Sequence, residues 1–517
     1  MADNPSIDDR RLSWRSALRS DLKEYWPLWV IVVAAVALRL WDMGRVPGIN
    51  GDEAWYGVQA QQLLAGRAID WRTPTGNVPG LLQIGSLWIL HSVFPPSLLL
   101  LRIPALLSSF GAMAMAYAVG RRFFDARAGM AALLMMACFP IVIAYARFGW
   151  DPSHSPVLAL IAIYAALARR RLLSALVFAF ALTNHPSSVF IAPFLTLALL
   201  GAGRAHGGWR PALLSAAAFV GLLLLAILFS FLLSVGASQY LDSGESAARI
   251  VDPQQAMAFM VGFGRLLSGD TIYRFVAGAG FGAARPVIDV ATALLLVAIG
   301  ATGIFALYRR PEWRAIGLVF GWFASLAALY VVAGRWTLNP GLERFAFPMI
   351  PLTALALAVL VSAAFANGRR HWLFQPLVAA VTLPMLAGYC HFMLRPLDRG
   401  TTSPFTAFWT GEVEPRQAAF DWIAAAGPVG GRIIAEDWWL SEPIAYYSAG
   451  SNFVVANANE GIASGGKAAA GDIYWVTYRG GPLDRALDRR SDVRRRGVIG
   501  TSNAQNSLQI WSSGNGR

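Results

Sequence analysis

Long apolar runs alternate with short polar or basic segments along most of the chain. A helix needs roughly 20 apolar residues to cross the hydrocarbon core of a bilayer, and runs approaching that length recur between residues 27 and 393. The pattern therefore predicts a polytopic α-helical membrane protein with about eleven spans, several of them short for a full crossing. The predicted spans are 27–43, 98–119, 128–146, 156–168, 172–184, 188–202, 211–235, 287–308, 315–333, 346–366 and 374–393.

The apolar segment PGLLQIGSLWILHSVFPPS, residues 79–97, is not counted among the spans. It is short and contains His91. If it crossed the membrane, every later basic cluster would change sides. We therefore predict a helix lying at the outer interface.

After the last apolar run the composition changes to soluble proportions of Gly, Asp, Arg and Ser. The stretch RQAAFDWIAAAG is typical of a helix, and four short apolar stretches separated by Gly and Asn are typical of strands. These stretches are GRIIAED, NFVVANA, DIYWVTY and SLQIWS. Residues 405–517 are accordingly predicted to form a small α/β domain.

The composition supports the membrane assignment. Hydrophobic residues make up 56% of the chain and charged residues only 14%, against about 25% charged residues in soluble domains. The two cysteines, Cys138 and Cys390, lie in apolar runs, so neither a disulfide framework nor a cysteine metal site is indicated.

The net charge of +13 comes largely from clusters between the apolar runs. In this arrangement the clusters indicate cytoplasmic loops, and no nucleic-acid-binding motif is visible. They precede the first span and follow the second, fourth, sixth, eighth and tenth: Arg10, Arg11, Arg15, Arg19 and Lys23; Arg121, Arg122 and Arg127; Arg169, Arg170 and Arg171; Arg204 and Arg210; Arg309, Arg310 and Arg314; Arg369 and Arg370.

This alternation predicts a cytoplasmic segment 1–26 and a transmembrane domain 27–395. Its outer loops would be 44–97, 147–155, 236–286 and 334–345, with the domain 405–517 on the same outer side. The first apolar run has no evident cleavage site after it and is predicted to be an uncleaved span.

Adjacent acids follow the first span in the stretch GINGDEAWYG, residues 48–57. The predicted topology places Asp52 and Glu53 outside, where a membrane-bound substrate meets water. Two structural explanations stay open. Asp52 could cap the following helix, and Glu53 could complement the helix dipole. Neither excludes a catalytic role, because a helix amino terminus favours the ionised carboxylate that a general base requires.

Other outer segments place further ionisable groups at the same face, where such groups near a membrane favour a functional interpretation. The structural alternatives are a helix start at Asp151, which precedes Pro152, ordinary loop hydrogen bonds for the two histidines, and snorkelling for Arg102 in LLLLRIPALL. The additional candidates are Arg147, Asp151 and His154 in ARFGWDPSHSP, Asn184 and His185 in TNHPS, and Arg335, Asn339, Glu343 and Arg344 in GRWTLNPGLERFAFP.

Four stretches occur in the order DEAWYGVQAQQLLAGRAI, LLLLRIPALLSSFGAMAMAYAVGRRFF, YARFGWDPS and ERFAFPMIP. Together they resemble the C-type (GT-C) glycosyltransferases that use polyprenyl-phosphate sugars, which include the protein O-mannosyltransferases and the lipid A aminoarabinose transferases. The resemblance covers roughly residues 27–395, and its most specific mark is the acidic pair after the first span. The length and trailing outer domain look more like the aminoarabinose-transferase branch. That branch carries a Glu-Lys-Pro element where this chain has PTGNVPG.

The resemblance implies an inverting sugar transfer at the periplasmic face of a bacterial inner membrane, most simply to a glycolipid of the lipid A or lipopolysaccharide type. It places the candidate base or acceptor-positioning group at Asp52, with Glu53 beside it, and the second-loop acid at Asp151. The partners would be a polyprenyl-phosphate-linked sugar, a lipid or glycan acceptor and membrane lipids.

The chemistry of such a transfer suits these residue types. An acceptor hydroxyl needs a carboxylate to take its proton, and a leaving phosphate needs cations, for which arginine is well suited. The predicted phosphate ligands are Arg102, Arg147, Arg335 and Arg344, and the predicted accompanying site residues are His154, His185, Asn339 and Glu343. No nucleotide-binding motif is present. No cofactor is indicated with certainty. Metal use stays open, because an acidic outer site could hold a divalent cation but no ligand spacing demands one.

Other functions remain as alternatives. A lipid or sugar transporter would show inverted repeats and charges near the bilayer midplane, and no repeat is apparent in this chain. A polysaccharide polymerase or ligase would use a pyrophosphate-linked donor. A non-catalytic assembly protein would use its outer domain to bind partners. Protein or polysaccharide acceptors would be served by the same transfer chemistry.

Overall fold

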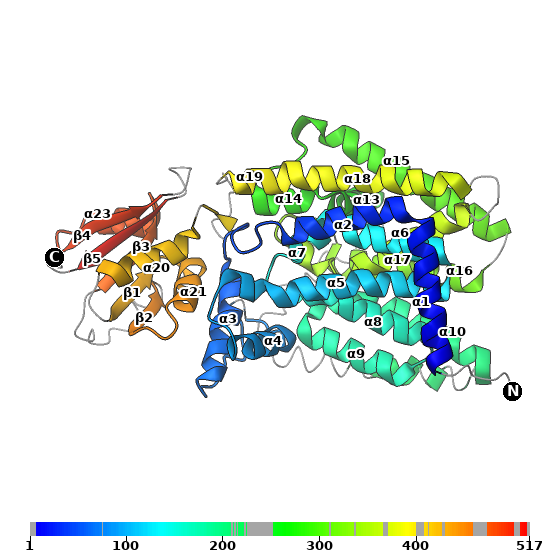
Figure 1. Cartoon of the computed structure of the whole chain (residues 1–517), viewed down its shortest axis with the longest axis horizontal. Coiled ribbons are helices and arrows are strands. Elements are labelled where there is room, and N and C mark those ends of the chain that lie inside the picture. Colours follow the sequence, from blue (N-terminus) through cyan, green and yellow to red (C-terminus); the bar gives the residue numbers. More distant parts are fainter. Residues whose placement is uncertain are drawn as a thin grey trace.

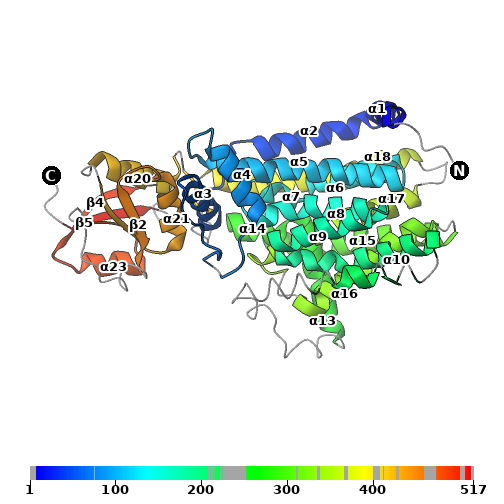
Figure 2. The same ribbon diagram turned by 90° about the horizontal axis from the view of Figure 1, so that it is seen from below.

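The computed structural model describes residues 7–74, 76–207, 252–309, 312–334, 338–365, 371–399, 408–411, 413–426, 430–458, 473–500 and 507–513, with isolated positions between 210 and 224. A long helical bundle forms one part of the molecule, and a small sheet with its helices lies at one end of it (Figures 1 and 2). The amino-terminal helix and the C-terminal sheet lie at opposite ends of the molecule (Figure 1).

The first half of the bundle consists of helices in chain order. They are α1 (Ile7–Glu24), α2 (Trp26–Leu40), α3 (Gly51–Leu64), α4 (Leu81–His91), α5 (Leu98–Phe123), α6 (Ala126–Cys138), α7 (Pro140–Tyr145), α8 (Ser155–Leu167), α9 (Arg171–Asn184) and α10 (Ala192–Gly207). The 3-10 helices Asp151–His154 and Pro186–Ile191 precede α8 and α10.

The second half adds α13 (Pro253–Ser268), α14 (Asp270–Ala277), α15 (Arg285–Arg309), α16 (Trp313–Ala333), α17 (Met349–Ala364), α18 (Phe374–Tyr389) and α19 (Arg395–Asp398). The 3-10 helices Gly282–Ala284, Glu343–Phe345 and His371–Leu373 precede α15, α17 and α18, and a π-helical turn, Cys390–Leu394, joins α18 to α19.

Four helices in the described ranges are long and apolar enough to cross a membrane: Leu98–Phe123, Gly282–Arg309, Trp313–Ala333 and Phe374–Asp398. Shorter apolar helices cover several other predicted spans, and α4 supplies the helix predicted within 79–97. A helical membrane protein is therefore confirmed, whereas about eleven spans are not. Most of the predicted span 211–235 lies outside the described residues.

The bundle core contains fully buried arginines whose donors satisfy carbonyl oxygens at helix ends. Arg39, near the end of α2, donates to the carbonyl oxygens of Met136 and Ala137 at the end of α6 (3.0 and 2.8 Å). Its Nε also donates to the Ser109 hydroxyl (3.0 Å). Carbonyls left unpaired at the break between α6 and α7 thus obtain partners, which buried backbone groups require.

The C-terminal sheet has strand order β2-β1-β3-β5-β4. The strands β1 (Gly431–Ala435), β2 (Phe453–Asn457) and β3 (Ile473–Tyr478) run parallel, while β5 (Leu508–Ser513) lies antiparallel to β3 and to β4 (Val493–Ile499). The helices are α20 (Pro415–Ala426), α21 (Trp438–Tyr447) and α23 (Pro482–Asp488). All four strands predicted from the sequence are present, and β4 is additional.

The helix α21 joins this sheet to the bundle by packing on α3. The indole rings of Trp438 and Trp439 lie against Gly51, where a Cβ atom would come within 2.7 Å of Trp438. The Tyr446 hydroxyl donates to the Ser97 carbonyl oxygen (3.2 Å) and accepts from the Ser97 backbone N–H (3.0 Å). The first turn of α3 is thus enclosed between the bundle and the C-terminal sheet.

Gly48 provides a test of this enclosure. A Cβ atom at Gly48 would lie 1.7 Å from the Trp409 carbonyl oxygen, which is backbone and cannot rotate away. We expect Gly48→Ala to lower the free energy of unfolding by about 1–3 kcal/mol or more, measured by thermal unfolding in detergent. Gly85→Ala in α4, which meets nothing within 4 Å, is the matched control and should not destabilise. Equal stability of both variants would contradict the close packing.

Candidate active site

The start of α3 settles which residue caps this helix. Asn50 is the N-cap: its side-chain oxygen accepts from the Glu53 backbone N–H (2.9 Å), and its own N–H donates to the Glu53 carboxylate (3.2 Å). This reciprocal arrangement is a capping box. The Asp52 side chain therefore takes no part in capping.

Glu53 is fully buried and its carboxylate accepts four hydrogen bonds. Two come from the Arg102 guanidinium (3.0 and 3.1 Å), one from the Asn50 backbone and one from the Gly149 N–H (2.6 Å). An ionised carboxylate offers about four acceptor positions, so every position of Glu53 is used. The Glu53 carboxylate therefore has no acceptor position left for the proton of a substrate, unlike the catalytic acid predicted from the sequence. It instead joins α3, α5 and the 146–150 segment.

Asp52 points to a different set of neighbours. Its carboxylate lies 4.0 Å from the Arg344 guanidinium, and its side chain is 14% exposed. Burial raises the pKa of Asp52 above its ordinary value, the Arg344 charge opposes this shift, and the negative charge of Glu53 adds to it. Asp52 is thus an accessible carboxylate beside a cation at a helix amino terminus.

Asp151 lies in the same electrostatic neighbourhood. Its pKa is raised to about 7, first by burial and then by the negative charge of Asp52, against the opposing charge of Arg344. The Asn184 side chain donates to the Asp151 backbone carbonyl (2.8 Å), and Gly80 is pressed against it so closely that a Cβ there would lie 2.4 Å from the Asp151 Cβ. The Tyr56 hydroxyl accepts from the Gly80 N–H (3.0 Å).

The loop before α17 supplies the cation and a third acid. Arg344 is 22% exposed, while Glu343 is fully buried and accepts from the Gly341 N–H (2.6 Å). Burial raises the pKa of Glu343 to about 7, against this hydrogen bond and the Arg344 charge. The buried Tyr145, at the end of α7, packs its ring against that of Phe347, with ring centroids 4.3 Å apart.

The two predicted histidines lie in different surroundings. His154 is buried between the Ser108 hydroxyl (2.6 Å) and the Gln83 side chain (2.8 Å), in a network that also holds Gly149 through Gln83. His185 contacts the Ser187 hydroxyl (2.5 Å), and its ring lies tilted against that of Phe345, with ring centroids 5.8 Å apart. The structure therefore gives His154 a structural position and brings only His185 close to the Arg344 segment.

Two of the four predicted phosphate ligands are inaccessible. Arg102 is fully buried, and its guanidinium donates hydrogen bonds to Glu53 and to the carbonyl oxygens of Met43 and Gly48. Arg147 is fully buried and donates to the carbonyl oxygens of Leu38, Arg39 and Val46. Arg335 lies outside the described residues. Arg344 is the predicted ligand that the structure places beside the acids.

Asn339 lines a separate pocket of about 420 Å³ together with Arg265, Arg274 and Arg285. These three arginines were not predicted from the sequence, and neither were Tyr56 and Tyr145. The available signal was two arginines within GRLLSGDTIYRF, residues 264–275, and a third ten residues after it. Among the described residues, no group of three or more His, Cys, Asp or Glu side chains could hold a metal ion.

The geometry therefore gathers Asp52, Asp151, Glu343 and Arg344 from three separate segments of the chain. Two of the acids have pKa values near 7, and Asp52 is paired with a cation. Carboxylates tuned in this way can take or supply a proton near neutral pH. The Arg344 guanidinium can meet a developing negative charge.

No protein-family model matches the chain, and no curated protein sequence matches it. Its structure is similar to ArnT from Cupriavidus metallidurans in the apo state, at 13% identity and a TM-score of 0.55, covering 93% of this chain and 97% of that one. ArnT bound to undecaprenyl phosphate matches at 13% identity and a TM-score of 0.53, covering 95% and 98%. The archaeal oligosaccharyltransferase AglB from Archaeoglobus fulgidus matches at 14% identity and a TM-score of 0.45, covering 85% and 65%. The chain has the fold of the GT-C glycosyltransferases, which confirms the resemblance at the level of the fold.

Glu53→Gln tests the structural role of the buried ion pair. The substitution preserves shape but leaves the Arg102 guanidinium buried without its counter-charge. Removing one partner of such a pair costs about 3–5 kcal/mol, so we expect a large fall in the thermal unfolding midpoint, or loss of folded protein in size-exclusion chromatography. The neighbouring Asp52→Asn is the matched control and should remain stable. A Glu53→Gln protein as stable as wild type would contradict the assignment.

The raised pKa values predict how stability depends on pH. Asp151 and Glu343 bind their protons more tightly when folded, with pKa values of about 7 against ordinary values of 3.8 and 4.5. The folded state therefore binds more protons than the unfolded state in this window, and its relative stability is lost as the pH rises through about 7.

We expect the unfolding midpoint of the wild type to fall between about pH 5 and pH 8. Asp151→Asn should flatten this dependence, because the amide cannot ionise. Asp488→Asn, at a side chain that is 64% exposed, is the control and should leave the profile unchanged. A wild-type midpoint that rises across this window would contradict the assignment.

Proposed function

We propose that this chain is a membrane glycosyltransferase that moves a sugar from a polyprenyl-phosphate donor to an acceptor hydroxyl, with inversion at the anomeric carbon. The observation that carries the proposal is the Asp52 carboxylate, which is spared from helix capping and paired with Arg344. The GT-C fold, and the undecaprenyl phosphate bound to ArnT, support the choice of donor.

The proposed reaction is a single displacement. Asp52 takes the proton of the acceptor hydroxyl as its oxygen bonds to the anomeric carbon. The bond from that carbon to the phosphate oxygen breaks, and its electron pair stays with the departing polyprenyl phosphate. Arg344 stabilises the negative charge on this phosphate. Asp151 and Glu343 adjust the charge of the site, because burial raises the pKa of each to about 7.

The acceptor is proposed to be a glycolipid of the lipid A or lipopolysaccharide type, with protein or polysaccharide acceptors as the alternative. The basic clusters support a cytoplasmic amino terminus and a site facing the periplasm of a bacterial inner membrane. Residues 27–395 would form the transferase domain and residues 405–517 a periplasmic domain, whose α21 closes over the start of α3. The proposed step uses no cofactor.

Asp52→Asn tests the proposed base directly. The amide keeps the size of the side chain but cannot take a proton, and loss of a general base typically lowers rates by about a hundred- to ten-thousandfold. We expect a stable variant that still binds undecaprenyl phosphate but transfers almost no sugar from a polyprenyl-phosphate sugar in detergent. Asp151→Asn should lose less, because Asp151 only adjusts the charge around Asp52.

Transport across a membrane cannot occur in detergent solution. Sugar transfer by the purified wild-type protein in detergent therefore also distinguishes an enzyme from a transporter. Asp488→Asn in the C-terminal sheet is the matched carboxylate control. A folded Asp52→Asn variant that retains more than about a third of wild-type turnover would show that another group takes the proton.

A further inference from the structure

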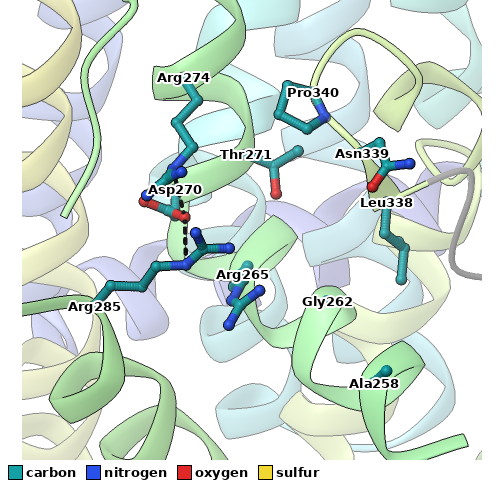
Figure 3. A pocket seen from close by; sticks show the side chains of 10 residues that line it. All are labelled: Ala258, Gly262, Arg265, Asp270, Thr271, Arg274, Arg285, Leu338, Asn339 and Pro340. Atoms are coloured by element: carbon teal, nitrogen blue, oxygen red, sulfur yellow. Dashed lines mark ion pairs between the residues drawn. The ribbon is translucent and has the colours of Figure 1, made fainter. Parts of the chain in front are cut away.

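A pocket of about 420 Å³ lies between α13, α14, the start of α15 and the loop 338–340. Its charged lining consists of Arg265, Arg274, Arg285 and Asp270, and its neutral polar lining includes Thr271 and Asn339 (Figure 3). The side chains of Arg274 and Arg285 converge on Asp270 from different elements (Figure 3). The pocket is therefore a cationic cavity and not a single surface arginine.

The charge in this pocket is not balanced. Asp270 is buried and forms ion pairs with both Arg274 (3.0 Å) and Arg285 (3.4 Å). A separate carboxylate, Asp289, neutralises Arg265 through two contacts. One acid thus serves two guanidinium groups, and one positive charge is left over.

The guanidinium groups of Arg274 and Arg285 also keep N–H donors that have no hydrogen-bond acceptor among the described residues. Asp270 accepts from the Phe281 N–H (3.0 Å), which fixes the carboxylate. Within the described ranges, neither Arg274 nor Arg285 makes a hydrogen bond beyond its ion pair with Asp270, and the Nε atom of each meets that carboxylate outside hydrogen-bond geometry. Guanidinium groups whose donors lack well-placed acceptors suit a ligand that carries several acceptor oxygens and a negative charge.

The pocket adjoins the candidate active site through one short loop. Leu338, Asn339 and Pro340 line the pocket, and the next turn of the same loop carries Glu343 and Arg344. The Leu342 N–H donates to the Asn339 carbonyl (3.0 Å), and the Gly341 N–H donates to Glu343 (2.6 Å). A group bound in the pocket is therefore held close to the residues that face Asp52.

The charge of the active site itself shows why a second cationic site is needed. Arg344 already faces Asp52, with Asp151 and Glu343 nearby. A phosphodiester donor brings a further negative charge, and its departing phosphate carries more. In a single displacement the base and the leaving phosphate lie on opposite sides of the anomeric carbon. Arg344, which also faces Asp52, therefore reaches only part of the phosphate, and its other oxygens need further donors.

We propose that the Arg274–Arg285–Asp270 pocket binds the phosphate ester of a lipid substrate. The assignment of that phosphate to a substrate rests on the proposed function. Arg274 and Arg285 supply charged N–H donors to the phosphate oxygens, and Thr271 and Asn339 supply neutral donors. Asp270 holds the two arginines in place. The negative charge of the ligand then balances the positive charge that Asp270 leaves unpaired. The phosphate belongs to the donor or to a phosphorylated acceptor, which share this chemistry.

The test measures lipid binding to the full-length protein in detergent micelles by native mass spectrometry. The probes are undecaprenyl phosphate, undecaprenol without a phosphate, phosphatidic acid as a phosphate ester on another lipid, and inorganic phosphate as competitor. The variants are Arg274→Gln, Arg285→Gln and the charge-retaining Arg285→Lys. Arg495→Gln, an exposed arginine of the C-terminal sheet, is the matched control.

We expect each Gln variant to weaken binding of a phosphate lipid roughly ten- to a hundredfold, as expected for loss of charge-assisted hydrogen bonds. Arg285→Lys should lose less, Arg495→Gln nothing, and undecaprenol binding should not change. An effect on undecaprenyl phosphate assigns the pocket to the donor, and an effect on phosphatidic acid alone assigns it to a different phosphorylated lipid. Displacement by inorganic phosphate alone, without any lipid effect, would show a site for the free anion and overturn the proposal.

Unchanged affinity for every phosphate lipid in the folded Gln variants would likewise overturn it. If a Gln variant fails to fold, Arg285→Lys together with competition by inorganic phosphate against wild type decides the question. The pocket assignment and the proposed transferase function can be refuted independently of each other. Arginine-dependent phosphate-lipid binding without any sugar transfer would leave the pocket assigned and remove the transferase, whereas transfer without arginine-dependent binding would do the reverse.

Discussion

The buried ion pair between Glu53 and Arg102 is the interaction on which the candidate site depends. Two charges without exposure to water are costly unless their hydrogen-bonding capacity is met. Here the carboxylate receives four hydrogen bonds, and the guanidinium also bonds the carbonyl oxygens of Met43 and Gly48. The pair thereby fastens the start of α3, the first half of α5 and the segment before Asp151 to one another.

The Glu53–Arg102 ion pair determines which neighbouring acidic side chains face the candidate site. Because Glu53 faces the pair, Asp52, one position earlier on the helix, is rotated by about 100° toward Arg344. The Gly149 N–H that binds Glu53 lies two residues before Asp151, so the second acid is positioned by the same contact. The loop 338–345 then brings Arg344 to the acids at one end and reaches the arginine pocket at the other. Structural and chemical roles are therefore divided between two adjacent carboxylates.

The sequence predicted the fold class, the helix 79–97, the four strands and the convergence of Asp52, Asp151 and Arg344, because hydrophobic period and loop chemistry are local signals. It could not separate the roles of Asp52 and Glu53, because the capping residue Asn50 and the partner Arg102 decide which acid is buried. Burial of Arg102 and Arg147 depends on contacts between distant segments. The strand β4 was missed because its VRRRGVI sequence carries three consecutive arginines, two of them exposed, and so lacks an apolar pattern. The arginine pocket depends on tertiary packing of α13, α14 and α15.

The central claim is a single displacement in which Asp52 acts as the base, and the stereochemistry of the product tests it most directly. The measurement is the anomeric configuration of the glycosidic product, determined by proton NMR after purified protein transfers sugar from a polyprenyl-phosphate donor of known configuration. One displacement with one base inverts the anomeric carbon, so the product should have the configuration opposite to the donor. A product with retained configuration would require a covalent sugar–enzyme intermediate and a carboxylate acting as nucleophile, and would contradict this account.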